Sequence, residues 1–283
     1  MTTDNPTENT ALPWSNGLYS IKRYGTTLTR CDSEPVQTPG CIQAHGAMLV
    51  LRLSDLSILQ ASENTAQFFD TAPEQLLGQS IKQVVGAENA VRLREVLEQE
   101  LVEHNAIYAF TLPQQHDKHA LDVSVHSIEG VAILEFEVTG RADTNNKNND
   151  DFFIRIKSAV NHLQGANSLR EFCQRVTDEV RSMTELDRVM IYRFHADHHG
   201  EVIGESKRDD LAPWLGFHYP EGDIPKPARE IFKRIWIRPL PNAAGPLVEL
   251  VPLANPDTGK ALNMTYCALR IARCIGYVHR ILG

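Results

Sequence analysis

Cysteine thiols are the most reactive side chains that this sequence offers. The 283 residues include five cysteines, and no two of them form a Cys-x-x-Cys pair. The odd count and the spacing argue against a disulfide framework and against a zinc site. Free thiols fit a reducing compartment and can act as nucleophiles, although a cysteine more often serves as a small buried residue. The cysteines are residues 31, 41, 173, 267 and 274.

Signatures of the common enzyme classes are absent from the sequence. It contains no Walker loop, no HExxH, no GxSxG and no kinase motif set. An enzyme with Cys31 or Cys274 as nucleophile and a histidine as base is one alternative, but nothing fixes a base beside either thiol. We therefore expect a protein that is not an enzyme.

The charge balance and the hydropathy pattern exclude two classes of partner. The chain has 28 basic and 36 acidic residues, a net charge of -8, whereas nucleic-acid binding requires a basic face. No apolar run reaches the roughly 18 residues that a membrane span needs. The N-terminus is polar and acidic, so it is not a secretory signal. We expect a cytoplasmic protein with no nucleic-acid or membrane partner.

The first half of the chain predicts strands, then short helices, then more strands. This order is typical of an α+β sheet domain. A helical repeat over residues 87–104 has its apolar positions at Val91, Leu93, Val96, Leu97 and Leu101. The expected strands cover residues 47–53, 58–62, 107–113, 121–130 and 131–140, and two shorter helices cover 64–69 and 73–77.

The second half begins after an asparagine-rich stretch, residues 141–151, which predicts a linker. Helices are expected over about 152–163 and over a second stretch that Asn167 or Ser168 caps and that ends near Met183. Strands follow at 187–195 and 201–206. The charge run GESKRDD by itself reads as a solvated loop. Residues 212–260 are rich in Pro and Gly, and an irregular section of that length is usually functional.

Several sequence blocks resemble bacteriophytochromes, in the order in which that family carries them. The Cys-first stretch with Glu-Pro and a Pro-Gly turn resembles the start of the family's PAS domain, and the later blocks resemble its GAF domain. The blocks are CDSEPVQTPGCIQAHGAML (31–49), DRVMIYRF (187–194), GEVIGESKRDDLAPWLGFHYPEGDIPKPAR (200–229) and PLVELVPLANPDTGKALNMTYCALR (246–270).

The resemblance implies an α+β fold with two domains, each an antiparallel sheet with flanking helices. We expect an N-terminal arm over residues 1–30, a PAS domain over 31–140, the linker over 141–151 and a GAF domain over 152–283. In the family, the N-terminal arm threads through a GAF loop as a figure-of-eight knot.

The family binds a linear tetrapyrrole, or bilin, and its chemistry explains several residue types. A bilin is long and mostly apolar, and it carries two propionates that the planar fork of arginine matches. By resemblance, Arg238 and Arg270 are the propionate ligands. Cys31 is the attachment point, because bacteriophytochromes form a thioether there with a vinyl group of biliverdin.

The same resemblance assigns the remaining chromophore-binding residues. Asp223 of the Asp-Ile-Pro motif offers its backbone carbonyl to the pyrrole nitrogens, and Ile224 and Pro225 flank the chromophore. Tyr192 and Tyr219 correspond to aromatic positions around the ring that rotates on light absorption. Cys41 lies in the Pro-Gly turn and is expected to be a packed small residue.

The C-terminal text departs from the family pattern after Arg270. The family continues with a Ser-Pro-x-His stretch and further GAF strands, whereas this chain reads IARCIGYVHRILG to its last residue. We therefore expect a GAF domain that is truncated at its C-terminus. The roles of Cys274 and His279 stay unassigned.

Two functions of different class follow. The first is a red/far-red photoreceptor module that binds biliverdin covalently and signals by conformational change. The alternative is a PAS/GAF interaction or remnant protein that no longer binds bilin productively. Pigmentation on co-expression with a heme oxygenase would separate them. A homodimer is the expected assembly to test, and the downstream signalling partner is not indicated by the sequence.

Overall fold

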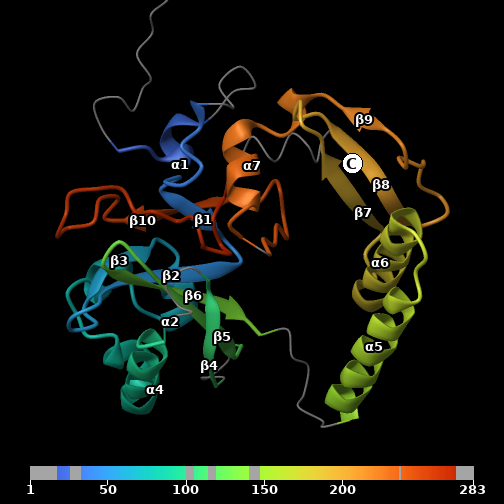
Figure 1. The fold of residues 1–283 in the computed structure, drawn as a ribbon. Helices are drawn as coiled ribbons and strands as arrows, with labels where there is room; N and C mark the ends of the chain where they lie inside the picture. Colours follow the sequence, from blue (N-terminus) through green and yellow to red (C-terminus); the bar gives the residue numbers. More distant parts are fainter. Residues whose placement is uncertain are drawn as a thin grey trace, which may run out of the picture. The chain divides into compact units, whose positions relative to one another are not determined.

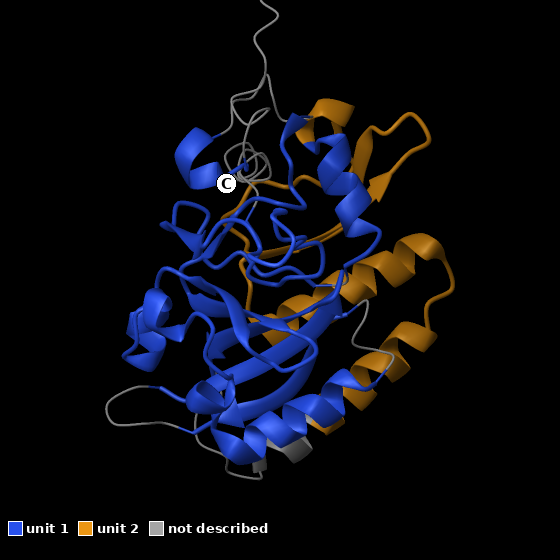
Figure 2. Ribbon diagram, turned by 90° about the vertical axis from the view of Figure 1, so that its left-hand side faces the viewer, with its two compact units in different colours: residues 1–140, 224–283 blue, residues 141–223 orange. Residues whose placement is uncertain are grey.

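A computed structural model describes residues 18–25, 33–99, 105–113, 119–139, 147–235 and 237–271. The chain divides into two compact units, which Figure 2 distinguishes by colour. Unit 1 comprises residues 1–140 and 224–283, and unit 2 comprises residues 141–223. Both contain helices and antiparallel strand pairs, so the predicted α+β class is confirmed. The predicted PAS, linker and GAF boundaries stay predictions.

Unit 1 contains a seven-stranded sheet that joins distant parts of the sequence (Figure 1). Its strand order is β1-β10-β3-β2-β6-β5-β4. Strand β10 lies between two early strands, with Glu249 opposite Cys41 and Leu250 opposite Ser62. The strands are β1 (Cys41–Gln43), β2 (Gly46–Arg52), β3 (Ile58–Ser62), β4 (Ile107–Leu112), β5 (Leu121–Ile128), β6 (Val131–Val138) and β10 (Leu247–Val251).

Both faces of this sheet are covered, as the alternation along β2 requires. Successive side chains of a strand point to opposite faces, and Leu49 and Leu51 belong to one buried cluster whereas Met48 and Val50 belong to another. Helices α2 (Thr65–Phe69), α3 (Pro73–Leu76) and α4 (Lys82–Leu97) add side chains to the first cluster. The second cluster is completed by residues far along the chain, namely Leu262, Met264, Cys267 and Leu269.

Unit 2 packs two helices and a three-stranded sheet. Helix α6 contacts strands β7 and β8, and α5 contacts α6. Ser168 caps α6, as the sequence predicts, because its hydroxyl accepts the backbone N–H of Glu171 at 3.1 Å. The elements are α5 (Lys147–Gln164), α6 (Leu169–Thr184), β7 (Arg188–Phe194), β8 (Gly200–Lys207), β9 (His218–Tyr219) and the 3-10 helix η3 (Glu221–Asp223).

Some predicted elements differ from the observed ones. Helix α5 begins at Lys147, not near residue 152, because its first turns lack the apolar positions that mark a helical repeat. Val91 on α4 is 60% exposed, so it does not belong to the buried stripe that Leu93 occupies. Residues 212–260 contain strand β10 and helix α7 (Lys226–Phe232), although they read as irregular.

The charge run at residues 204–210 is another difference, because it is not a solvated loop throughout. Residues up to Lys207 belong to β8, and Glu205 is only 8% exposed. Its carboxylate pairs with Arg188 and accepts the backbone N–H of Trp214 at 2.9 Å. A carboxylate can be buried in this way because the ion pair and the hydrogen bonds compensate for its lost hydration. Among the helices of the described residues, none has the length and apolar content that crossing a bilayer demands.

Candidate functional site

Arg270 is a fully buried cation in unit 1. It forms an isolated β-bridge with Ile42, and its side chain is 0% exposed. Its Nη1 donates to the backbone carbonyl of Val36 at 2.8 Å, whereas Nε and Nη2 have no hydrogen-bond partner among the described residues. Burial, and next the positive charge of Arg238, lower the pKa of the guanidinium to about 10. The group therefore remains charged at neutral pH.

Arg238 is the second cation of this group. It is half-buried, and its Nε and Nη2 also meet no hydrogen-bond partner within the part of the chain that the structure describes. Desolvation lowers the pKa of Arg238, while the carboxylate of Glu34 acts in the opposite direction. Glu34 is buried, and it also favours the charged form of Arg270. These three charges thus form one electrostatic group within unit 1.

The two guanidinium groups are suited to binding an anion. A buried donor without a partner costs about 1–3 kcal/mol, and more when it is charged. Arg238 and Arg270 together leave four such nitrogens. Because a guanidinium presents parallel N–H groups that match a carboxylate, carboxylate groups of a ligand would satisfy them. Arg238 and Arg270 are therefore the residues of unit 1 that could hold an acidic cofactor.

Glu135 on strand β6 fixes the backbone that leads to Arg270. Its two carboxylate oxygens accept the backbone N–H groups of Ala268 at 3.0 Å and of Leu269 at 2.6 Å. Complete burial raises the pKa of Glu135 to about 7, although these hydrogen bonds and the charge of Arg270 favour the ionised form. Glu135 thus positions Arg270 through the main chain.

The Asp-Ile-Pro motif crosses from one compact unit to the next along the chain. Asp223 ends η3 in unit 2, and Ile224 begins the second segment of unit 1. Pro225 is the N-cap of helix α7, where its missing N–H leaves no helical bond unmade. The buried Arg229 donates from Nη1 to the carbonyl of Ile224 at 2.5 Å. The motif therefore has a fixed backbone at the start of α7.

Unit 2 contributes a group of aromatic side chains. The ring centroids of Tyr192 and Tyr219 are 6.0 Å apart, and those of Tyr192 and Phe194 are 5.2 Å apart in an edge-to-face pair. A Cβ atom at Gly200 would stand 1.8 Å from the hydroxyl oxygen of Tyr192, so the Tyr192 ring can lie over this position only because it is glycine. Burial raises the pKa of Tyr219. This group offers an apolar surface to a conjugated ring.

The structure brings some of the predicted residues together and leaves one undescribed. Arg238 and Arg270 form the cationic group of unit 1, and Tyr192 and Tyr219 form the aromatic group of unit 2. The predicted attachment residue, Cys31, lies outside the described residues, as do Cys274 and His279. Cys41 is buried, as expected of a packed small residue, and so are Cys173 and Cys267.

Sequence reasoning missed the residues that support these groups. Glu135 alternates with apolar neighbours in VAILEFEV, a pattern that normally places such an acid on a solvent face. Its burial follows only from the later segment that covers this face. Glu34 lies in the block CDSEPVQ and Gly200 begins the block GEVIGES, but the family resemblance assigned a role to neither residue.

Glu135 predicts a pH dependence of stability. Its pKa rises from 4.5 to about 7 on folding, so the stability it contributes is fully present below pH 4.5 and is lost as pH rises through 7. Glu135→Gln cannot titrate, and it leaves one backbone N–H without an acceptor. We expect the wild type to have a larger free energy of unfolding than Glu135→Gln at pH 4.5. The difference between the two proteins is expected to narrow by about 3 kcal/mol by pH 8.

Urea unfolding of both proteins at several pH values measures this gap. The control is Glu88→Gln, because Glu88 is an exposed carboxylate on helix α4. A gap between wild type and Glu135→Gln that is independent of pH would contradict the prediction.

Comparisons with known proteins agree with this reading of the chain. The family described as PAS fold matches residues 31–139. The chain is 36% identical to cyanobacterial phytochrome B of Nostoc over 249 residues, which is 87% of this chain and 33% of the relative. It is also 36% identical to a bacteriophytochrome of Pseudomonas aeruginosa over 86% of this chain and 32% of the relative. The chain thus spans about a third of the length of these curated relatives.

Two solved structures are similar to the chain in fold and in sequence. The chromophore-binding domain of a bacteriophytochrome from R. palustris gives a TM-score of 0.78 at 30% identity and covers 89% of this chain and 81% of its own. The corresponding domain from Stigmatella aurantiaca gives a TM-score of 0.77 at 31% identity and covers 89% of this chain and 82% of its own. The predicted fold class is therefore confirmed at the level of architecture. Because sequence and fold agree along most of both chains, this protein belongs to the bacteriophytochrome family.

Proposed function

We propose that this chain is the photosensory module of a red/far-red light receptor, which binds biliverdin covalently and signals by conformational change. The observation that carries the proposal is the set of four guanidinium nitrogens on Arg238 and Arg270 that have no hydrogen-bond partner among the described residues. A family that reads light through a bilin supplies the ligand class, because a bilin presents two propionates. Biliverdin is the bilin that the cysteine position favours.

The residues take different roles toward the bilin. Arg238 and Arg270 bind the propionates, and the backbone carbonyl of Asp223 accepts hydrogen bonds from the pyrrole nitrogens. Ile224 and Pro225 pack against the chromophore. Support for these roles is the fixed backbone at the start of α7 and the open donors of the two arginines. When bound, the bilin would supply the absorption of red light, because amino-acid side chains absorb only in the ultraviolet.

Cys31 is the proposed attachment residue. Its sulfur adds to a vinyl carbon of biliverdin, and the thiol proton ends on the neighbouring vinyl carbon, so no oxidant is required. The figure-of-eight knot of the family is proposed here too. Contacts between the N-terminal segment and β10 support it, since Ser20 and Arg23 both bond Glu249 and Ile21 is buried against Ile271.

The aromatic group of unit 2 is the proposed neighbour of the ring that rotates after light absorption. The rings of Tyr192 and Tyr219 are tilted by 36° to each other, and rotation of the bilin ring would change the side-chain contacts of this pair. The signal would then be a shift between two protein states with different contacts to that ring. The partner that receives the signal is a protein region or molecule beyond the described chain. The expected cytoplasmic location fits this role.

The attachment residue predicts a difference between wild type and Cys31→Ser. After biliverdin addition, the wild type is expected to show a red absorption band and a zinc-fluorescent band on a denaturing gel. Cys31→Ser is expected to lose the gel label while Cys41→Ser keeps it, because only Cys31 forms the thioether. A wild type with neither band nor label would favour the alternative, an interaction or remnant protein without a bilin.

The arginine pair predicts opposite effects on stability and on binding. Arg238→Met removes a buried charge whose donors lack partners in the described residues, so the bilin-free protein is expected to keep or gain stability. Biliverdin affinity is expected to fall about tenfold or more, because a charged hydrogen bond is worth about 1.5–3 kcal/mol. Thermal unfolding measures the stability, and biliverdin titration in the Cys31→Ser background, where no thioether forms, measures the affinity.

Arg234→Met is the matched control, because Arg234 lies four residues earlier on the same segment and is exposed. It is expected to change neither stability nor affinity. If Arg238→Met binds biliverdin as tightly as the wild type, the propionate role of Arg238 is wrong.

We also propose a homodimer that forms through the helices of unit 2. Exposed apolar side chains gather on α5 and α6, which is unusual for a solvated helix pair. The exposed fractions reach 72% at Phe153 and 66% at Ile154 and Leu169, and the group also includes Phe172 and Val180.

Ile154→Glu is expected to convert a dimer into a monomer, because it places a charge in the apolar contact. Light scattering on a sizing column, at several protein concentrations, measures the mass. Ile237→Glu is the control, since Ile237 is 83% exposed on unit 1. A wild type that is monomeric at every concentration would contradict this assembly.

A further inference from the structure

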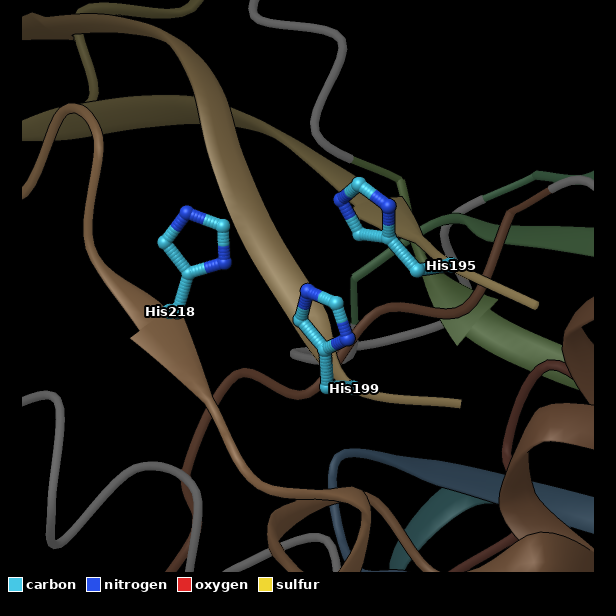
Figure 3. Close-up of side chains that lie close together, drawn as sticks. All are labelled: His195, His199 and His218. Carbon is cyan, nitrogen blue, oxygen red and sulfur yellow. The ribbon is translucent and has the colours of Figure 1, made fainter. Parts of the chain in front are cut away.

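Three histidines of unit 2 converge beside the turn between β7 and β8 (Figure 3). His195 directly follows β7, His199 directly precedes β8, and His218 begins β9. One ring nitrogen from each lies within 4.8 Å of a ring nitrogen of the other two. None of the three has a role in the proposed bilin chemistry, so the cluster requires an explanation of its own.

The backbone holds these histidines in place. The turn is closed by the hydrogen bond from the N–H of His195 to the carbonyl of His199, at 2.9 Å. This closure places the two rings in a parallel stack, with centroids 4.1 Å apart and an angle of 6° between the planes. His218 comes from the next strand, where it pairs in register with Glu201, and its ring centroid is 5.2 Å from that of His199. The strand pairing and the closed turn therefore bring the three histidines together.

Carboxylates surround the rings on the side of β8. Oδ1 of Asp197 lies 2.5 Å from Nδ1 of His199, which leaves Nε2 of His199 available as a ligand. Oε2 of Glu201 lies 2.8 Å from Nε2 of His195, and its Oε1 lies 4.0 Å from Nε2 of His218. Metal-binding histidines typically have such a carboxylate partner, which orients the ring and makes it a better ligand.

We propose that His195, His199 and His218 bind a divalent transition-metal ion of the zinc class, with Glu201 as the carboxylate that orients the His195 ring. Imidazole nitrogens suit Zn²⁺, Ni²⁺ and Cu²⁺, and three histidines with one oxygen ligand give the tetrahedral set that Zn²⁺ prefers. Ligand nitrogens around Zn²⁺ stand about 3.3 Å apart when each bond is about 2.0–2.1 Å. An imidazole binds a metal in the plane of its ring, so the parallel rings of His195 and His199 would have to rotate out of their stack before their nitrogens could converge on one ion.

The cluster is also accessible to an ion from solvent. The side chains of His195, His199 and His218 are 26%, 32% and 56% exposed. A second group, His126 with Glu135 and Cys267, also has metal-ligand types close together, but all three are buried. Both oxygens of Glu135 already accept backbone N–H groups. Between these two groups, the histidine cluster is therefore the one that a metal ion can enter.

A bound ion would join the β7–β8 turn to β9. The turn and β9 are otherwise connected through β8, whose pairing with β9 covers only Gly200 with Tyr219 and Glu201 with His218. Metal bonds from both sides would strengthen this short pairing. The expected consequence is a more stable β9 in the metal-bound protein.

The test is calorimetric titration of the full chain with ZnCl₂, after treatment with a chelator and without bilin. Leaving out bilin keeps tetrapyrrole nitrogens from binding zinc, and it makes the result independent of the proposed light-sensing function. We expect the wild type to bind one zinc ion with an affinity that His199→Ala and His218→Ala each weaken about tenfold or more. Glu201→Gln is expected to weaken binding less than either histidine variant.

His198→Asn is the matched control, because His198 lies in the same turn but outside the cluster. Asparagine tolerates the positive φ of 69° at this position, and zinc affinity is expected to be unchanged. Circular dichroism checks that each variant is folded. Because His199 and His218 lie on different elements, either variant can test the proposal if the other one misfolds. Absence of zinc binding in the wild type, or a zinc affinity equal to that of the wild type in both His199→Ala and His218→Ala, would overturn the proposal.

Discussion

The charged guanidinium of Arg270, held in the interior of unit 1, is the constraint on which the rest of this structure depends. A buried charge is stable only where other groups compensate for lost hydration. Here the carbonyl of Val36 and the carboxylates of Glu34 and Glu135 give part of that compensation. The remaining donors of Arg270 and Arg238 have no partner among the described residues, so an anionic ligand that bound them would stabilise the folded state.

This constraint explains why segments distant in sequence build one unit. Glu135 fixes the main chain before Arg270, and residues 262–269 then cover the face of the sheet from which Met48 and Val50 project. Strand β10 enters between β1 and β3 in the same sheet. A ligand that binds Arg270 would therefore stabilise contacts between the start and the end of the described chain, and the sheet would transmit that stabilisation.

Local patterns predict the local parts of this fold and not its long-range pairings. The strand-like runs of β2 and β3 and a cap of α6 at Asn167 or Ser168 are visible in short windows, and the structure has both strands where they were expected and Ser168 as the cap. Strand β10 was missed although Leu-Val-Glu-Leu-Val favours a strand, because the Pro and Gly residues of 212–260 indicated an irregular section and its pairing partners, β1 and β3, are distant in the sequence. The roles of Glu135 and Glu205 were missed for the same reason, since burial of an acid depends on segments that cover it later. Family resemblance, and not periodicity, directed attention to Arg238 and Arg270.

Unit 2 combines two kinds of site on the same strands. Tyr219 follows His218 directly on β9, and Gly200, over which Tyr192 lies, follows His199 on entering β8. An ion held by the histidines would restrain the backbone that carries both tyrosines, because neighbouring residues of a strand share its hydrogen-bond ladder. In the two proposals, ring rotation of the bilin would act on side chains at the aromatic group, whereas a metal ion would act on the strand ends that carry the histidines. Metal binding and bilin ring rotation would therefore be coupled through β8 and β9. The coupling free energy would depend on how far the short strand β9 can move.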